Sequence, residues 1–223
     1  ENAVVFGIEM RPHSSPVIAG GPAGPAPKGL SWMKLTDAAR LESGHTPSRK
    51  RPEWWSGDVP WLSLTDIRKP HGRHAYETTE STNAAGLANS SARLLPAGTV
   101  CVSRTASIGF VTILAKPMAT SQDFCNWICG PDLDPEFLMY AFMASRDYLR
   151  DLGSGAVHKT IYMPAIESFH VCAPEIGEQQ RLARMLCDRL AAANELDKAL
   201  RAQIDYIERL PQRPLAAAFG QLK

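Results

Sequence analysis

The sequence predicts an α+β fold: a mixed α/β domain over residues 29–174, followed by a long, coiled-coil-like C-terminal helix. Two patterns predict it. Short β-type runs and helical segments alternate irregularly up to residue 174, separated by Pro, Gly and Ser/Thr, which is typical of α+β domains. From "PEIGEQQRLARML" (174–186) onward, charged and apolar residues recur at helical spacing, and after this stretch no Gly or Pro occurs until Pro211.

The elements of the first half follow from local pattern. Residues 1–28 end in the Gly/Pro/Ala-rich "AGGPAGPAPK", which has no periodicity and predicts a tail or linker. Residues 30–44 are strand-like and then helical, with Gly44 as the expected helix stop. Apolar and polar residues alternate through "VPWLSLTDI" (59–67), which predicts a half-buried strand.

The second half of the domain shows the same mixture. Residues 99–103 and 109–114 are β-rich and are joined by a polar turn. Residues 134–152 predict one helix, because Asp134 suits the N-cap and Pro135 the first helical position. A final strand is expected in "IESFHVCAP", closed by Pro174.

A helix over 176–210 is 35 residues, or about 52 Å, long. Its apolar residues recur at steps of three and four and form a narrow stripe, which favours a seam with a partner helix. Those residues are Leu182, Leu186, Leu190, Ala193, Leu196, Leu200, Ile204 and Ile207. The alternative is a terminal helix folded back across the sheet. Residues 175–223 are predicted to combine this spacer or dimerisation helix with a C-terminal docking segment after Pro211.

Composition sets limits on function. With 44% hydrophobic and 21% charged residues and no apolar run long enough for a membrane span, the chain predicts a cytoplasmic globular protein. Five cysteines without a CxxC pair and with apolar neighbours predict reduced, buried thiols. The formal net charge is only +1, so nucleic-acid binding must depend on local charge. Residues 40–74 carry seven Lys/Arg against four Asp/Glu, a local balance of +3.

No catalytic motif is found in the sequence. Phosphate-binding loops, a G-x-S-x-G elbow and the Asn/Asp-Pro-Pro-aromatic tetrapeptide of amino-methyltransferases are all missing. His71 and His74 are spaced for a metal but lie in a loop without further ligands, so solvated histidines are favoured there. Cys125 and Cys129 are favoured as core residues of a strand over zinc ligands. The chain is therefore predicted to be non-catalytic, with no metal or cofactor of its own.

Binding loops are the remaining functional signal. "TPSRKRPEWWSGDVPW" (46–61) places three basic residues beside tryptophans, and such side chains bind phosphates and guanine edges. Arg49 and Lys50 are interpreted as DNA contacts and the tryptophans as core anchors. The polar turn 103–109 and the Gly/Ser loop 153–160 are further candidates.

Taken in order, these pieces resemble the DNA-specificity subunit of Type I restriction–modification systems over residues 29–223. The segments that carry the resemblance are "LESGHTPSRKRPEWWSGDVPWLSLTDI", "LPAGTVCVSRTASIGFVTIL", "MATSQDF", "GSGAVHKTIYMPAI", "APEIGEQQRLARML" and "ERLPQRPLAAAFGQL". The candidate DNA-binding residues are then Arg49, Lys50, Arg68, Lys69, Arg104, Thr105, Ser107, Gln122, His158, Lys159 and Thr160.

The resemblance implies a target-recognition domain (29–174) that reads one half of a bipartite DNA sequence. It also implies a spacer helix on which methyltransferase subunits dock, with S-adenosylmethionine bound by those partners and a restriction subunit left open. At about 50 Å the helix spans roughly 15 base pairs.

Such subunits usually carry two recognition domains and two helices, whereas this chain has one set. It is either a half-size subunit that forms a homodimer on a split palindrome, which is preferred, or the second half of a longer subunit. Two other readings stay open: a recognition domain cut from a fused restriction–methylation enzyme, or a coiled-coil interaction protein without a DNA role. The sequence holds no code for the target bases or for the base that is methylated.

Overall fold

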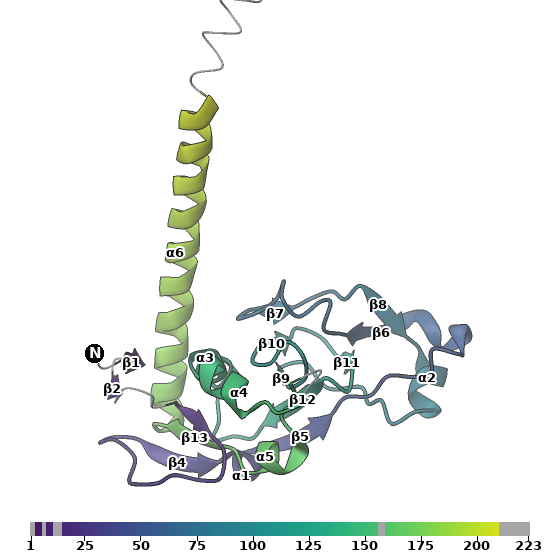
Figure 1. Ribbon diagram of the computed structural model, residues 1–223, viewed down its shortest axis with the longest axis horizontal. Coiled ribbons are helices and arrows are strands. Elements are labelled where there is room, and N and C mark those ends of the chain that lie inside the picture. The colour runs from purple at the N-terminus through teal and green to yellow at the C-terminus, as the bar shows by residue number, and fades with distance from the viewer. Residues whose placement is uncertain (1–2, 6–7, 11–14, 156–158, 210–223) are drawn as a thin grey trace, which may run out of the picture. The chain divides into compact units, whose positions relative to one another are not determined.

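The computed structural model describes residues 3–5, 8–10, 15–155 and 159–209. The chain divides into two compact units, Glu1–Arg181 and Leu182–Lys223. The first unit is a mixed α/β domain, and the described part of the second is the continuation of one uninterrupted helix, α6 (Ile176–Arg209), shown in Figure 1. The predicted fold class, a mixed α/β domain with a long C-terminal helix, is confirmed.

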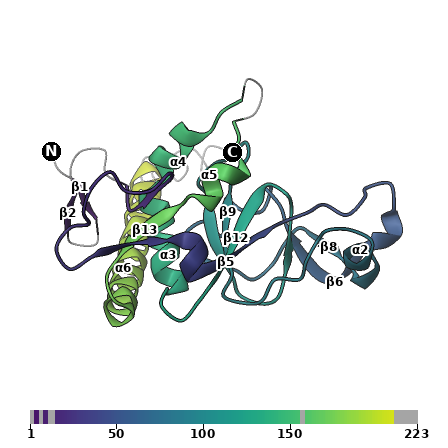
Figure 2. The ribbon, with the colours of Figure 1, turned by 90° about the horizontal axis from the view of Figure 1, so that it is seen from below.

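A five-stranded sheet forms the middle of the domain. Its strands are, in spatial order, β5 (Ala39–Ser43), β12 (Phe124–Cys129), β9 (Val100–Ser103), β10 (Val111–Leu114) and β7 (His74–Ala75). All neighbours are antiparallel except β10 and β7. Figure 2 shows β5, β12 and β9 side by side. Phe124 and Trp127 of β12, the strand between β5 and β9, are fully buried and belong to the core.

Two smaller sheets lie at opposite ends of the domain, as both ribbon views show (Figures 1 and 2). One contains β11 (Ala119–Thr120), β6 (Trp55–Leu62) and β8 (Glu80–Thr82), with the short helices η1 (Pro52–Trp54) and α2 (Ala84–Ala88). The other contains β3 (Val17–Ile18), β13 (His170–Ala173) and β4 (Ser31–Lys34). Near the N-terminus, β1 (Ala3–Val5) pairs with β2 (Ile8–Met10).

The strands expected at 99–103 and 109–114 are present as β9 and β10, whereas the helix expected over 134–152 is two helices. They are α3 (Pro135–Ala144) and α4 (Arg146–Leu152). Asp134 caps α3 as predicted, accepting a hydrogen bond from the Phe137 amide at 2.9 Å. The break falls at Ser145, whose hydroxyl donates to the Ala141 carbonyl and accepts from the Val17 amide at 2.9 Å. A contact 128 residues away along the chain therefore accompanies the break.

Two other local expectations are wrong. The helix in residues 30–44 is only the single turn α1 (Leu35–Ala38), and the chain continues as β5 because these residues pair with β12. Gly44 is thus no helix stop. It lies against the backbone of Ser121, where a Cβ would approach the carbonyl oxygen to 1.9 Å. Within the segment expected to be a tail or linker, Val17 is fully buried and pairs with β13.

The start of α6 is attached to the domain through Gln179, whose side chain is almost completely buried. Its amide nitrogen donates to the carbonyls of Asp132 and Pro174 at 3.1 and 2.9 Å. Its amide oxygen accepts from the Asp134 main-chain N–H at 2.9 Å. Further along, every side chain from 187 to 209 is exposed. The stripe residues Leu196, Leu200, Ile204 and Ile207 are 49–62% exposed in the single chain.

The five cysteines form no disulfide. Cys101, Cys125 and Cys172 are buried, Cys129 is half-buried, and Cys187 on α6 is exposed, so the expectation of buried thiols is wrong for Cys187. Burial raises the pKa of Cys125 and Cys129 to about 12 each, which keeps both thiols protonated at neutral pH. Within the described residues, no helix is both long and apolar enough to cross a membrane.

Candidate nucleic-acid interface

Four polar segments that are distant in sequence are joined by hydrogen bonds in the domain. They are residues 45–50, the turn 104–109, residues 121–123, and residues 153–155 and 159–161. The hydroxyl of Thr46 donates to the side-chain oxygen of Gln122, and the His45 amide donates to the Thr120 carbonyl at 2.9 Å. The Ala106 amide donates to the Lys159 carbonyl at 2.9 Å. Three loops that the sequence analysis singled out separately therefore belong to one surface.

Arg104 joins three of these segments. Its Nε donates to the Gln122 carbonyl and its Nη1 to the Ile161 carbonyl, both at 3.2 Å. Its own amide and carbonyl bond to Asp123 and Ile161. Beside it, Thr105 pairs with Thr160 in an isolated antiparallel bridge. The geometry gives Arg104, Thr105 and Thr160 a part in holding the loops together, in addition to the DNA contact predicted for them.

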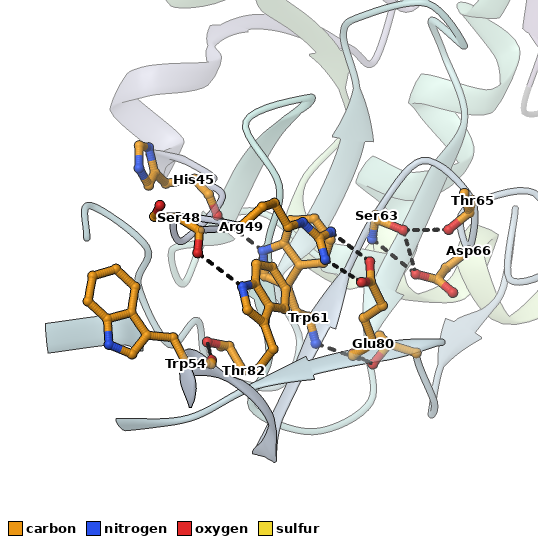
Figure 3. Close-up of polar contacts among 12 residues, drawn as sticks. His45, Ser48, Arg49, Trp54, Trp61, Ser63, Thr65, Asp66, Glu80 and Thr82 are labelled. Carbon is orange, nitrogen blue, oxygen red and sulfur yellow. Dashed lines mark hydrogen bonds and ion pairs between the residues drawn. The ribbon is translucent and has the colours of Figure 1, made fainter. Parts of the chain in front are cut away.

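Arg49 lies on an aromatic platform and is paired with a carboxylate. Its guanidinium carbon is 3.8 Å from the centroid of the Trp55 ring and 5.0 Å from that of Trp61. Both of its terminal nitrogens donate to Glu80 of β8, as Figure 3 shows. These hydrogen bonds raise the pKa of Arg49 and lower that of Glu80. Arg49 is half exposed, and Glu80 engages both of the terminal nitrogens that could otherwise contact a guanine edge together.

Trp55 and Trp61 have different roles in the structure, which the sequence did not indicate. Trp61 is buried, and its indole N–H donates to the His45 carbonyl at 3.1 Å, which fixes the start of the 45–50 segment. Trp55 is half-buried and meets Trp61 edge to face with ring centroids 5.0 Å apart. Trp61 is thus the core anchor that was expected, while Trp55 also supports Arg49.

Asp66 organises the loop that carries Arg68 and Lys69. It is buried and accepts hydrogen bonds from the amides and hydroxyls of Ser63 and Thr79 at 2.5–3.1 Å. Figure 3 shows Ser63, Thr65 and Asp66 drawn together beside Glu80. Next to this loop is a cavity of about 540 Å³, whose lining includes Lys69, Arg73, His74 and Tyr76. Arg68 and Lys69 are both exposed and form no ion pair with any described residue.

The remaining predicted residues are distributed over the same surface. Lys50, Gln122 and Lys159 are exposed, and Ser107 is half-buried. The Ser107 carbonyl accepts from the Ser103 hydroxyl, which closes the 104–109 turn. His158 lies outside the described residues.

Sequence reasoning missed the partners of these residues. Glu80, the ion-pair partner of Arg49, is 31 positions away from it in the sequence. Arg146, on α4, lies over the ring of Phe110 at the end of the 104–109 turn. Neither relation has a sequence spacing that could have indicated it, since both depend on how distant segments pack in the fold. Among the described residues, no three His, Cys, Asp or Glu side chains are grouped as a metal site. The arrangement presents donors and cations, which suits binding to a polyanion.

Solved structures with a similar fold come from Type I restriction–modification systems. The chain superposes on a chain from a structure of Type I restriction–modification complex assembly with a TM-score of 0.71 and 17% identity, covering 90% of this chain and 48% of that one. It superposes on the HsdS subunit of Thermoanaerobacter tengcongensis with a TM-score of 0.62 and 14% identity, covering 82% of this chain and 42% of that one. At these identities the likeness concerns the fold.

Sequence comparison gives the family. The profile of the Type I restriction modification DNA specificity domain matches residues 27–206, and the chain belongs to this family. Over 165 residues it is 28% identical to the Type I restriction enzyme MjaIX specificity subunit of Methanocaldococcus jannaschii, covering 73% of this chain and 38% of that protein. It is 30% identical over 131 residues to the HindI specificity subunit of Haemophilus influenzae, covering 58% and 28%. The chain therefore spans less than half the length of these relatives.

Proposed function

We propose that this chain is a non-catalytic DNA-recognition unit of a Type I restriction–modification system, and that its domain reads one half-site of the target. One observation carries the proposal beyond family membership. The separately predicted loops 45–50 and 104–109 and the described residues 159–161 of the third loop are joined by hydrogen bonds into one surface with exposed Lys50 and Lys159. A continuous surface of several loops can follow a groove, whereas isolated cations give only non-specific attraction.

The helix supplies the second half of the proposal. The exposed part of the stripe, from Leu190 to Ile207, binds a partner helix, which belongs to a second copy of the chain or to a second recognition half of a longer subunit. Leu182, expected in the same seam, is already buried in the single chain. The 49–62% exposure of Leu196, Leu200, Ile204 and Ile207 along one helix face supports this seam. Methyltransferase subunits that bind S-adenosylmethionine dock on this assembly in the cytoplasm, with association of a restriction subunit left open. The chain itself supplies no cofactor site.

The deciding experiment is a selection of bound sites from random duplex DNA, with the chain purified together with its natural partners. We expect a split sequence, inverted if the assembly is a homodimer and asymmetric if it has two different halves. Recovery of no preferred sequence at any salt concentration would contradict the proposal and favour a protein–protein scaffold.

Charge reversal then tests the surface. Lys50→Glu and Lys159→Glu should abolish selective binding with little change in folding, because both side chains are exposed. Lys34→Glu is the matched control, since Lys34 is an exposed cation of β4 in the sheet at the other end of the domain. Equal DNA affinity for all three variants would argue against this surface.

A further inference from the structure

The side chains of Arg68, His71 and Arg146 lie around the ring of Phe110. These four residues are called the Phe110 cluster below. The guanidinium carbon of Arg146 is 4.1 Å from the ring centroid and that of Arg68 is 5.7 Å from it. The His71 ring meets Phe110 edge-on with centroids 5.0 Å apart. The face of an aromatic ring attracts cations, so one phenylalanine here supports two arginines.

The two arginines lack a counter-charge. Ten ion pairs connect the described residues, and neither Arg68 nor Arg146 takes part in any of them. The Nε of Arg146 is also buried without a hydrogen-bond acceptor among the described residues. A buried donor without an acceptor is costly, and a partly desolvated cation without an anion is more so. The cluster is therefore short of both negative charge and hydrogen-bond acceptors.

His71 is held at the edge of the cluster by the backbone of Val111. Its Nδ1 lies 3.1 Å from the Val111 amide nitrogen and 3.3 Å from the Val111 carbonyl oxygen. Burial, and to a smaller extent the charge of Arg146, lower the pKa of His71, which favours the neutral ring.

The cluster is fixed to the turn that carries Arg104, Thr105 and Ser107. The Phe110 amide donates to the Ser103 hydroxyl at 3.0 Å, and the Phe110 carbonyl accepts from the Ser103 amide at 2.8 Å. Gly109 has a φ of +82°, and a Cβ there would lie 2.8 Å from Cγ of Arg146. This close approach places the Arg146 stem directly against the turn.

We propose that the Phe110 cluster binds one backbone phosphate of the DNA beside the 104–109 turn. This inference rests on the proposed function, since it supposes that the turn meets DNA. Guanidinium groups bind phosphate oxygens through paired, charge-assisted hydrogen bonds, and a phosphate supplies the acceptors that this cluster lacks. Such a contact fixes the position of the turn on the duplex and carries no base information itself.

Salt dependence distinguishes a phosphate contact from a base contact. Neutralising one phosphate contributes about −0.9 to the slope of log Kobs against log salt concentration. With the natural assembly and its selected duplex, the double variant Arg68→Gln/Arg146→Gln should make the slope shallower by about 0.9. Each single variant should change it in the same direction, and the preference among target sequences should be unchanged.

Two controls separate this contact from general electrostatics. Arg150→Gln removes a cation from the same helix, but Arg150 is paired with Asp147 at 3.6 Å. Lys116→Gln removes an exposed, unpaired cation beyond the opposite end of β10 from Phe110. Both controls should keep the wild-type slope. Because Arg68 is exposed, Arg68→Gln alone tests the inference even if replacement of Arg146 disturbs folding.

The possible failures are distinct. Sequence-selective binding by the wild type with an unchanged slope in Arg68→Gln and in the double variant overturns the phosphate site only. A changed base preference in these variants would also overturn it, by making the cluster a base reader. Absence of selective binding in the wild type would overturn the proposed function and this inference with it.

Discussion

The domain and the helix leave opposite kinds of groups without partners. In the domain the large apolar side chains are mostly buried, while Arg68, Lys69, Arg73 and Arg146 form no ion pair with any described residue. On the helix, Lys198, Arg201 and Arg209 each pair with a carboxylate one turn earlier. The stripe residues from Leu190 to Ile207 are exposed. The domain therefore has cations without anionic partners, and the helix has apolar side chains without an apolar partner surface, which indicates two different classes of partner.

The difference has a simple origin. Helix geometry brings residues three and four apart together, so a single helix can pair its charges within itself but has no interior in which to bury a stripe. A domain of several sheets has such an interior, yet its charges meet only where strand order places them. Residues 184–209 accordingly have five Lys/Arg and five Asp/Glu, a balance of zero. The exposed fractions of the side chains alone would not have distinguished the unpaired cations of the domain from the paired charges of the helix.

The largest expected effect is loss of association through the helix. Burial of a Leu or Ile side chain contributes about 1.5–3 kcal/mol, so Leu200→Gln/Ile207→Gln should weaken self-association or association with the second half by roughly 10²- to 10⁴-fold. Sedimentation measures this, and circular dichroism should show a folded domain. Ala202→Gln is the control, since Ala202 is exposed and lies about 200° round the helix from Ile204. Association that persists in the double variant would mean that the stripe is not the seam.

A smaller effect on DNA binding is expected when Arg49 loses its carboxylate partner and becomes an unpaired arginine on an aromatic ring, like Arg68. Glu80→Gln removes its counter-ion but leaves the platform of Trp55 and Trp61. Stability should fall by less than about 1 kcal/mol because the pair is exposed. If the released Arg49 takes a phosphate, the slope of log Kobs against log salt becomes steeper by about 0.9.

Glu53→Gln is the matched control for Glu80→Gln, because Glu53 pairs with exposed Arg51, for which no aromatic platform is found among the described residues. An unchanged slope in Glu80→Gln would show that Arg49 is a structural residue, with or without its carboxylate.

The smallest effect concerns pH. The pKa of His71 is lowered in the folded domain, so the unfolded chain takes up a proton more readily than the folded one. The stability that neutral His71 contributes is present above about pH 6.5 and is lost as the pH falls below that value. Urea unfolding between about pH 5.5 and 7.5 should show this loss in the wild type and a flatter profile in His71→Gln. Parallel profiles would mean that folding does not lower the pKa of His71.

The features that were predicted correctly from the sequence depend on local residues. The N-cap at Asp134, the strands now seen as β9 and β10, and the helix α6 each follow from a few neighbouring residues. The break at Ser145 and the strand β5 were missed because each depends on a distant segment, Val17 in one case and β12 in the other. The same holds for the site: the loops were predicted, but Glu80 and the Phe110 cluster come from pairings that no spacing reveals.

The attachment of Gln179 bears on how such a chain can diversify. All three of its hydrogen bonds are to main-chain atoms, namely the carbonyls of Asp132 and Pro174 and the amide of Asp134. Main-chain atoms persist through substitution, so side chains in the loops 45–50 and 104–109 can change without altering this joint. On the proposed function, a lineage can thus acquire a new DNA target by point mutation in those loops while inheriting the same junction between domain and helix.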